Sequence, residues 1–335
     1  MTTDITMLTG DRPTGPLHLG HYAGSLVERV RMQDIEARRF IMIADAQAYT
    51  DNIGDTAKVR DAIPMLVADY IASGIDPEKS TIFLQSAVPE IVELMQIFMN
   101  ITTLARTLRN PTVGEEIKQR GFEKSLPLGF AAYPVAQSAD ILGFRATHVP
   151  VGSDQLPMIE LASETAARIN RMAGADVLVI PQVVLTSTTR LPGIDGHAKA
   201  SKSLNNAIYL SDAQDEVKRK VMQMFTDPGH LRVTDPGKVE GNAVFAYLDA
   251  FDADKEKIAH LKDRYREGGL GDVTIKKELI GVLEGLLQPM RDRRPDPVAD
   301  REICLDVLRR GTASAREVVS QVLADVRRAL GMFSL

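Results

Sequence analysis

The first half of the chain alternates short apolar runs with patterns of helical period, and this alternation limits the fold most strongly. The runs have the length of strands and cover residues 5–8, 40–44, 81–84, 148–151 and 177–180. Between them, apolar residues recur at spacings of three or four, for example from Leu19 to Val30 and from Val59 to Ile71. Strands that alternate with helices predict an α/β fold, in which helices cover both faces of a parallel sheet. Ligands of such sheets bind at the carboxyl ends of the strands.

Helical patterns dominate after about Leu185, interrupted by loops such as residues 226–241, which are rich in Asp, Pro and Gly. Ser314 and Glu317 match a capping box, which predicts that a last helix begins there and ends near Gly331. The chain is therefore expected to divide into a nucleotide-binding α/β domain over residues 1–190, a loop over 191–204, a helical domain over 205–310 and a last helix over 311–335.

The composition narrows the class of protein. Cys304 is the only cysteine among 335 residues, so no internal disulfide and no cysteine-based metal site can form. The sequence has no run of 18 apolar residues, and residues 1–10 lack the features of a signal peptide, so we expect a cytoplasmic protein with no membrane partner. A net charge of −5 argues against a surface that binds nucleic acid everywhere, but local basic clusters such as residues 218–220 remain compatible with RNA binding.

The segment from Gly10 to Gly24 carries the first chemical motif, between the first expected strand and the first expected helix. Its glycines let backbone amides approach a phosphate, and the start of a helix adds unpaired N–H groups. His18 and His21 are three residues apart, so both can face one side of the helix and donate hydrogen bonds to phosphates. A lone histidine would be interpreted as a surface residue, whereas two that frame Gly20 behind Pro-Thr-Gly favour a phosphate site.

The second motif is Lys-Ala-Ser-Lys-Ser, residues 199–203, in a segment that follows Pro192, Gly193 and Gly196. Two lysines three residues apart in a loop flanked by glycines suit a clamp for a polyphosphate, because lysine offers a compact charge on a mobile stem. Taken alone, the segment would be interpreted as an ordinary basic surface loop. Its combination with the histidine motif favours a nucleotide site.

His-x-Gly-His near the N-terminus and Lys-x-Ser-Lys-Ser much later resemble the two signatures of class I aminoacyl-tRNA synthetases. The distance between them and the chain length resemble the tyrosyl and tryptophanyl branch, and residues 241–249 and 268–272 extend the resemblance into the helical half. The resemblance implies a Rossmann-like catalytic domain, a mobile lysine loop, a helical anticodon-binding domain and a last helix that packs back on the catalytic domain. It also implies ATP as a substrate that brings Mg²⁺ with it, a tRNA partner and a homodimer.

The segment from residue 133 to residue 142 resembles the amino-acid-binding helix of this branch. Asp140 would accept the indole N–H of tryptophan, because indole is only a donor, and Tyr133 and Gln155 would hold the α-amino group. A tyrosyl enzyme is the close alternative, since Tyr133, Gln137 and Asp140 also fit its Tyr-x-x-x-Gln-x-x-Asp spacing.

Three features favour tryptophan over tyrosine, and therefore tRNA(Trp) as the partner. Tyrosyl members place a tyrosine two residues before the glycine that matches Gly10, and this chain has Leu8 there. The pattern Pro-Thr-Gly-x-Leu-His-x-Gly-x-Tyr-x-Gly also looks tryptophanyl. Finally, Val149 and Val151 belong to a segment similar to the tryptophanyl pattern, and both are available as walls of an indole pocket.

The resemblance implies that tryptophan is first activated with ATP and then transferred to the tRNA. It assigns residues to catalysis, ATP binding and tryptophan binding. Because the activation step needs no protein nucleophile, the catalytic residues would align the substrates and stabilise charge. Catalysis is assigned to His18, His21, Lys199 and Lys202. ATP binding is assigned to Arg12, Pro13, Thr14, Gly20, His21, Gly152, Ser153, Asp154, Leu191, Lys199, Ala200, Ser201, Lys202 and Ser203. Tryptophan binding is assigned to Leu8, Gly10, Tyr133, Gln137, Asp140, Val149, Val151 and Gln155, and no protein metal site is expected.

Some positions depart from the pattern of many relatives. Ala200 and Gln137 stand where many have Met, and Gln47 stands where many have His. Some relatives keep Gln at both of the latter positions, which indicates a subfamily. Two alternatives of other kinds are a synthetase paralogue that binds without charging tRNA and a nucleotidyltransferase with the same histidine turn. The two intact motifs disfavour the first, and the lysine loop with the long helical half disfavours the second.

Overall fold

A parallel sheet forms the centre of the computed structural model, which describes residues 5–186, 191–196, 199–202 and 204–333. Its five strands lie in the order β3-β2-β1-β4-β5, and every neighbouring pair is parallel. The strands are β1 (Thr6–Asp11), β2 (Arg38–Ile43), β3 (Thr81–Leu84), β4 (His148–Val151) and β5 (Gln182–Leu185). The chain builds outward from β1 to β3 on one side and then returns to β4 on the other. The sheet therefore has a switch point between β1 and β4, where a crevice for a ligand is expected.

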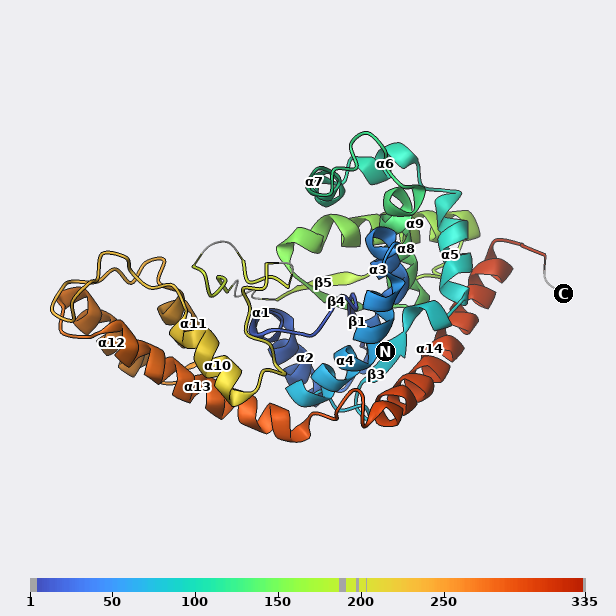
Figure 1. Cartoon of the computed structure of the whole chain (residues 1–335). Coiled ribbons are helices and arrows are strands. Elements are labelled where there is room, and N and C mark those ends of the chain that lie inside the picture. Colours follow the sequence, from blue (N-terminus) through green and yellow to red (C-terminus); the bar gives the residue numbers. More distant parts are fainter. Residues whose placement is uncertain (1–4, 187–190, 197–198, 203, 334–335) are drawn as a thin grey trace.

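Helices cover both faces of this sheet, which confirms the expected α/β fold (Figure 1). The helices of the body are α1 (Leu19–His21), a π-helical turn (Tyr22–Leu26), α2 (Val27–Arg31), α3 (Asp45–Asn52), α4 (Thr56–Ser73), α5 (Glu90–Met99), α6 (Leu104–Leu108), α7 (Pro111–Gln119), α8 (Leu128–Gly143) and α9 (Leu156–Ala173). Short 3-10 turns follow α2, β3 and β4, at Met32–Asp34, Gln85–Ala87 and Ser153–Gln155. Among the helices of the described residues, none is long and apolar enough to span a membrane.

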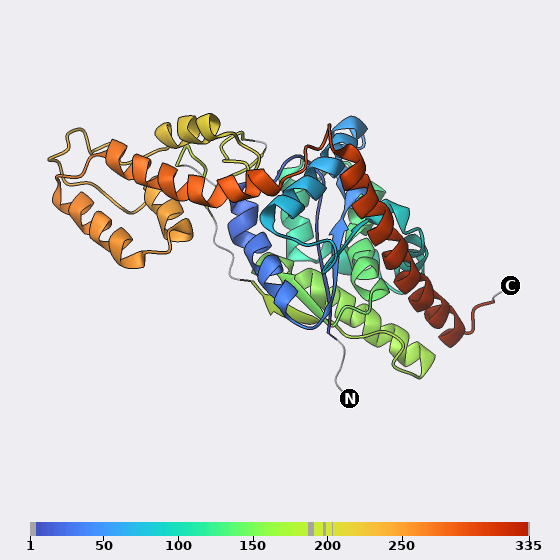
Figure 2. The same cartoon turned by 90° about the horizontal axis from the view of Figure 1, so that it is seen from below.

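The C-terminal half forms a helical arm beside the α/β body (Figures 1 and 2). It contains α10 (Gln214–Met222), α11 (Ala243–Phe251), α12 (Lys255–Glu267) and α13 (Asp272–Arg293), and α13 leads back to the body. One apolar core runs from Ile41 and Ile43 of β2 into the arm at Phe245 and Tyr265. The alternate β2 residues, Phe40 among them, join a second core on the opposite face, as the two-residue period of a strand requires.

The last helix, α14 (Arg301–Ala329), packs along β3, α4 and α5 of the body. It crosses β3 at Gly311, where a Cβ atom would lie 1.9 Å from the carbonyl oxygen of Ile82. The expected start at Ser314 is wrong, because the buried face of the helix continues upstream through Val307 to Cys304. A capping box is a local signal, and a buried stripe with helical spacing outweighs it. The expected division at residue 311 therefore falls inside one continuous helix.

The expected strand over residues 177–180 is also wrong, and β5 begins at Gln182, two residues after the end of that run. The side chain of Asn170 on α9 accepts the N–H groups of Val177 and Leu178 and donates to the carbonyl of Leu178. These backbone groups are thus paired with a side chain and not with a strand. Pro181 then contributes no N–H to a ladder, and the segment can join β4 only from Gln182 onward.

Candidate active site

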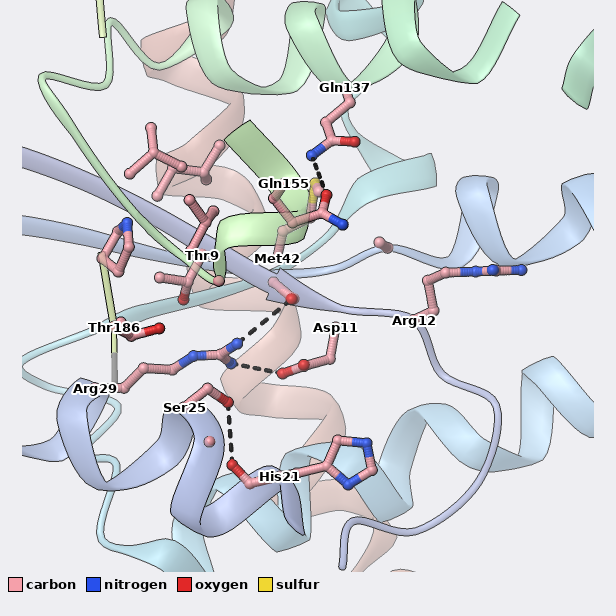
Figure 3. A pocket seen from close by; sticks show the side chains of 18 of the residues that line it. Thr9, Asp11, Arg12, His21, Ser25, Arg29, Met42, Gln137, Gln155 and Thr186 are labelled. Carbon is pink, nitrogen blue, oxygen red and sulfur yellow. Dashed lines mark hydrogen bonds and ion pairs between the residues drawn. The ribbon is translucent and has the colours of Figure 1, made fainter. Parts of the chain in front are cut away.

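A cavity of about 420 Å³ opens at the switch point of the sheet, at the carboxyl ends of β1 and β4 (Figure 3). A second cavity of about 590 Å³ adjoins it, because Arg12, Gly20, His21 and Lys199 line both. A third, of about 130 Å³, shares Arg12, Gln47, Gln137 and Gln155 with the first. Residues from both sequence motifs thus meet around one connected space, although the motifs lie far apart in the sequence. Lys202 and Gly15, which are in contact, are separated by 187 positions.

The two histidines of the first motif hold each other in one orientation. Nδ1 of His18 accepts the N–H of Gly20 at 3.1 Å, and Nδ1 of His21 accepts the N–H of His18 at 3.2 Å. Since an acceptor nitrogen carries no proton, both neutral rings carry theirs on Nε2. Burial lowers the pKa of His18 to about 3, with His21 and Lys202 adding to the effect, and burial and Lys202 lower that of His21 to about 4. Both rings are therefore neutral donors at neutral pH.

One side chain, Lys202, ties the lysine segment to the loop before the histidine turn, and backbone contacts tie the segment to Leu191 and Asn206. Nζ of Lys202 donates to the carbonyl of Gly15 at 2.7 Å, and burial lowers the pKa of Lys202. Ala200 donates its N–H to Leu191, and Ser201 donates its N–H to the side chain of Asn206. Lys199 and Lys202 consequently face the same cavity as His18 and His21.

Further cations surround the second cavity. The carboxylate of Asp51 on α3, whose side chain is 4% exposed, pairs with both Arg12 and Arg120. Lys58 lines the same cavity from α4. Nε of Arg12 is buried and has no hydrogen-bond partner among the described residues, so this donor is left for a ligand. The second cavity thus has the charge and the donors that a polyphosphate needs.

The end of β1 carries an ion pair, Asp11 with Arg29, that faces the first cavity (Figure 3). Arg29 lies 2.5 Å from Asp11, and Tyr70 donates to the same carboxylate oxygen at 2.7 Å. Burial raises the pKa of Asp11, but Arg29 outweighs burial and the result is a pKa of about 2. Asp11 therefore stays ionised, and Arg29 is fixed beside the space between β1 and β4.

Asp140 lies at the deep end of the first cavity, and its surroundings differ from those of Asp11. Gln47 donates to Oδ2 of Asp140 at 2.6 Å, and Gln85 donates to Oδ1 at 2.8 Å and to Oδ2 at 3.0 Å. Oε1 of Gln85 accepts the backbone N–H of Gln47 in the first turn of α3, so its amide nitrogen must face the carboxylate. Both partners are uncharged, and burial raises the pKa of Asp140 to about 7 even though the two amides oppose it.

Apolar groups form the walls beside this carboxylate. Leu8, Met42, Val149 and Val151 line the cavity from neighbouring strands. Only glycine fits at position 10 of this wall, since a Cβ atom there would lie 2.7 Å from the carbonyl oxygen of Met42. A flat apolar ring with one N–H donor would satisfy both the walls and the carboxylate.

Comparisons with known proteins identify the family. The family model described as tRNA synthetases class I (W and Y) matches residues 1–288. The chain belongs to this family. It is 52% identical to a tryptophan–tRNA ligase of Clostridium longisporum, over 97% of this chain and 96% of the relative, and 49% identical to one of Lactococcus lactis, over 98% of both. The crystal structure of a tryptophanyl-tRNA synthetase from Campylobacter jejuni, complexed with ADP and tryptophan, is similar with a TM-score of 0.85 at 28% identity. That similarity covers 98% of this chain and 100% of the other.

Within this class I synthetase, most of the residues assigned from the sequence lie on the connected space. The first cavity takes Leu8, Gly10, Gln137, Asp140, Val149, Val151, Gly152, Asp154 and Gln155, and the second takes Thr14, His18, Ala200, Ser201 and Lys202. Arg12, Gly20, His21 and Lys199 line both. Pro13 and Leu191 are buried and Ser153 is exposed, and none of the three lines these cavities. Ser203 lies outside the described residues.

Tyr133 is placed differently from Asp140, although both are on α8. It lines the third cavity, and its hydroxyl donates to Glu116 on α7 at 2.9 Å. Gln137, one turn along the helix, donates to Gln155 at 3.3 Å where the first and third cavities meet. The side chain of Tyr133 is thus one turn removed from the cavity that contains Asp140.

Sequence reasoning missed several residues of the candidate site: Arg29, Asp51 and Arg120 line its cavities, and Gln85 holds Asp140. None belongs to a contiguous motif, and each reaches the site only through the fold. The described residues contain no cluster of three or more His, Cys, Asp or Glu that could hold a metal ion.

Proposed function

We propose that this enzyme activates L-tryptophan with ATP and transfers the tryptophanyl group to tRNA(Trp). In the first step a carboxylate oxygen of tryptophan attacks the α-phosphorus of ATP, the bond to the β-phosphate breaks, and pyrophosphate leaves. In the second step a ribose hydroxyl of the tRNA attacks the activated carbonyl and AMP leaves. The observation that carries the proposal is the single connected space, basic at one end and apolar around a carboxylate at the other.

The basic end suits the phosphates of ATP. His18 and His21 present neutral Nε2–H donors, and Lys199 and Lys202 add positive charge to the same cavity. Arg12 contributes its unpartnered Nε. Catalysis then consists of alignment and of stabilising the charge that develops on pyrophosphate, with no protein nucleophile. Mg²⁺ would arrive with ATP, because it commonly rests on substrate phosphates with few protein ligands.

The apolar end suits the indole. A carboxylate offers about four acceptor positions, and the two glutamines use three of those on Asp140, which leaves one on Oδ1 for the indole N–H. The α-amino group would lie toward Gln137 and Gln155, at the junction of the first and third cavities. Tyrosine would bring a phenol oxygen that is both donor and acceptor, whereas the indole is only a donor.

The second half of the reaction needs a place for the tRNA. We propose that the helical arm, α10 to α13, binds the anticodon, because it extends away from the α/β body (Figure 1). Four apolar side chains are exposed along α5 and α6, namely Val92, Met99, Leu104 and Leu108, and they suit the interface of a homodimer in the cytoplasm. Light scattering of the purified chain would test the dimer.

ATP–pyrophosphate exchange with each amino acid tests the proposed function. We expect exchange with tryptophan and almost none with tyrosine. Asp140→Asn should raise the KM for tryptophan at least tenfold, because the amide no longer provides a charged acceptor. Asp61→Asn, on the exposed face of α4, is the matched control and should behave as the wild type. Exchange that prefers tyrosine, or an Asp140→Asn enzyme with unchanged selectivity, would refute the assignment.

A further inference from the structure

Asp69 is a buried carboxylate that the reaction outlined above does not use. It lies on α4 among Leu66, Val67, Ala68 and Tyr70, and its side chain is 0% exposed. It lines none of the three cavities described above. Since a buried charge is costly unless it is paired, its partners show what it is for.

The two oxygens of Asp69 hold two different parts of the molecule. Oδ2 accepts the backbone N–H of Leu17 at 2.7 Å, and Oδ1 accepts Nε of Arg294 at 2.8 Å. Leu17 immediately precedes His18, and its carbonyl accepts the N–H of Leu210 at 3.0 Å. Both backbone groups of Leu17 are therefore fixed by tertiary contacts just before the histidine turn begins.

Arg294 connects this arrangement to the helical arm. It follows α13 directly, and α13 is the long helix that runs from the arm to the body (Figure 2). Its neighbour Arg293 donates to the carbonyl of Ala72, so the end of α13 contacts α4 at two points. A shift of α13 would move Arg294, and with it the carboxylate that holds Leu17.

We propose that Asp69 and Arg294 are positioning residues that set the orientation of the His18–His21 turn according to the position of α13. The inference rests on the proposed function, in which these histidines contact the phosphates of ATP. His18 depends on its backbone for its orientation, because its ring caps α1 through the N–H of Gly20 and its N–H binds His21. A displacement of Leu17 therefore moves both imidazoles together.

Substitution of Arg294 tests the proposal in the full chain. In Arg294→Met the carboxylate of Asp69 loses its cation, and we expect kcat of ATP–pyrophosphate exchange to fall about ten- to hundredfold, the size of effect that small misplacements produce. The KM for tryptophan should change less than twofold, since Asp140 lies in a different part of the site. The amide of Leu17 should exchange its hydrogen for deuterium faster than in the wild type.

Arg145→Met is the matched control. Arg145 pairs with Asp325 of α14 at 2.7 Å and joins the last helix to the body without touching the histidine turn. This variant should keep kcat within twofold and leave the exchange at Leu17 unchanged. An Arg294→Met enzyme with the kcat of the wild type, or one whose melting temperature falls without any change in kcat, would overturn the proposal.

Asp69→Asn provides a second route should Arg294→Met fail to fold. Its amide oxygen still accepts from Leu17, but its NH₂ group faces Arg294, so the connection to α13 alone is broken. We expect kcat to fall as in Arg294→Met, with no further loss in the double variant, because the two residues act as one unit. Wild-type kcat in Asp69→Asn, or losses that multiply in the double variant, would contradict the inference. A wild-type enzyme without tryptophan-dependent pyrophosphate exchange would instead refute the proposed function. Deuterium exchange at the amide of Leu17 would still test whether Arg294 acts on Leu17 through Asp69.

Discussion

Tryptophan affinity should depend on pH through Asp140. Burial raises the pKa of this carboxyl to about 7, and the hydrogen bonds from Gln85 and Gln47 lower it only in part. The ionised carboxylate is the stronger acceptor for the indole N–H, because a charged acceptor makes a shorter and stronger hydrogen bond than a neutral one. Because the pKa of an acid is raised, the ionised form is complete well above pH 7 and is lost as the pH falls through 7. Affinity for tryptophan should therefore weaken on the acidic side.

The size of the effect follows from the ionised fraction. When only the ionised form binds, the apparent Kd is the intrinsic Kd divided by that fraction. With a pKa of about 7 the apparent Kd should be about elevenfold higher at pH 6 than at high pH, about twofold higher at pH 7 and about 1.1-fold higher at pH 8. His18 and His21 do not titrate in this window, since their pKa values are about 3 and about 4.

The chain itself provides a direct assay, because it contains no tryptophan. Fluorescence of the substrate indole can therefore be followed without a contribution from protein tryptophan, as a titration at each pH between 6 and 8. Gln85→Met removes two of the three hydrogen bonds to Asp140 and should move the midpoint to higher pH. Asp140→Asn should bind weakly with no dependence on pH. A Kd that is constant across the range, or a pH dependence that survives in Asp140→Asn, would refute the reasoning.

Three further results are expected. Lys202→Met should lower kcat of pyrophosphate exchange about 10²-fold. The KM for tryptophan should stay within twofold, because Lys202 lines only the second cavity. Lys218→Met, at an exposed position on α10, is the control in the same assay. Gly311→Ala should lower the free energy of unfolding by about 3 kcal/mol in urea titrations, because its Cβ would lie 1.9 Å from the carbonyl oxygen of Ile82; an unchanged midpoint would show that α14 does not cross β3 there. Gly281→Ala on α13, where a Cβ meets nothing within 4 Å, should instead raise the free energy of unfolding by up to about 1 kcal/mol.

The parts of the fold that the sequence predicted are those encoded by neighbouring residues. The runs at residues 81–84 and 148–151 coincide with β3 and β4, since a short apolar run between helices has few alternatives to a buried strand. The wrong strand at residues 177–180 was lost to one side chain, Asn170, seven or eight residues upstream. A hydrogen bond of that kind leaves no trace in hydrophobic periodicity.

The candidate site shows the same difference between features encoded by neighbouring residues and features that depend on distant ones. Both phosphate motifs are contiguous, so they could be recognised before their meeting place was known. Gln85, Arg120 and Arg294 reach the site or its supports from separate helices and turns, and nothing beside them in the sequence marks them. Asp69 gave one usable signal, a carboxylate within the apolar stretch from Leu66 to Tyr70, which predicts a buried polar group with a partner but does not name Arg294.

The partners of the buried carboxylates indicate how the site separates its two tasks. Asp11 is paired with Arg29 and Asp69 with Arg294, and these carboxylates hold backbone or side chains in place. Asp140 has only the amides of Gln47 and Gln85. An arginine paired with Asp140 would occupy the last acceptor position of this carboxylate and compete with the indole N–H. Two neutral amides fix the carboxylate and leave that acceptor position free. Because neither amide carries a positive charge, the pKa of Asp140 stays raised, at about 7. The proposed selection of a donor-only ring and the expected sensitivity to pH near 7 thus follow from the same choice of partners.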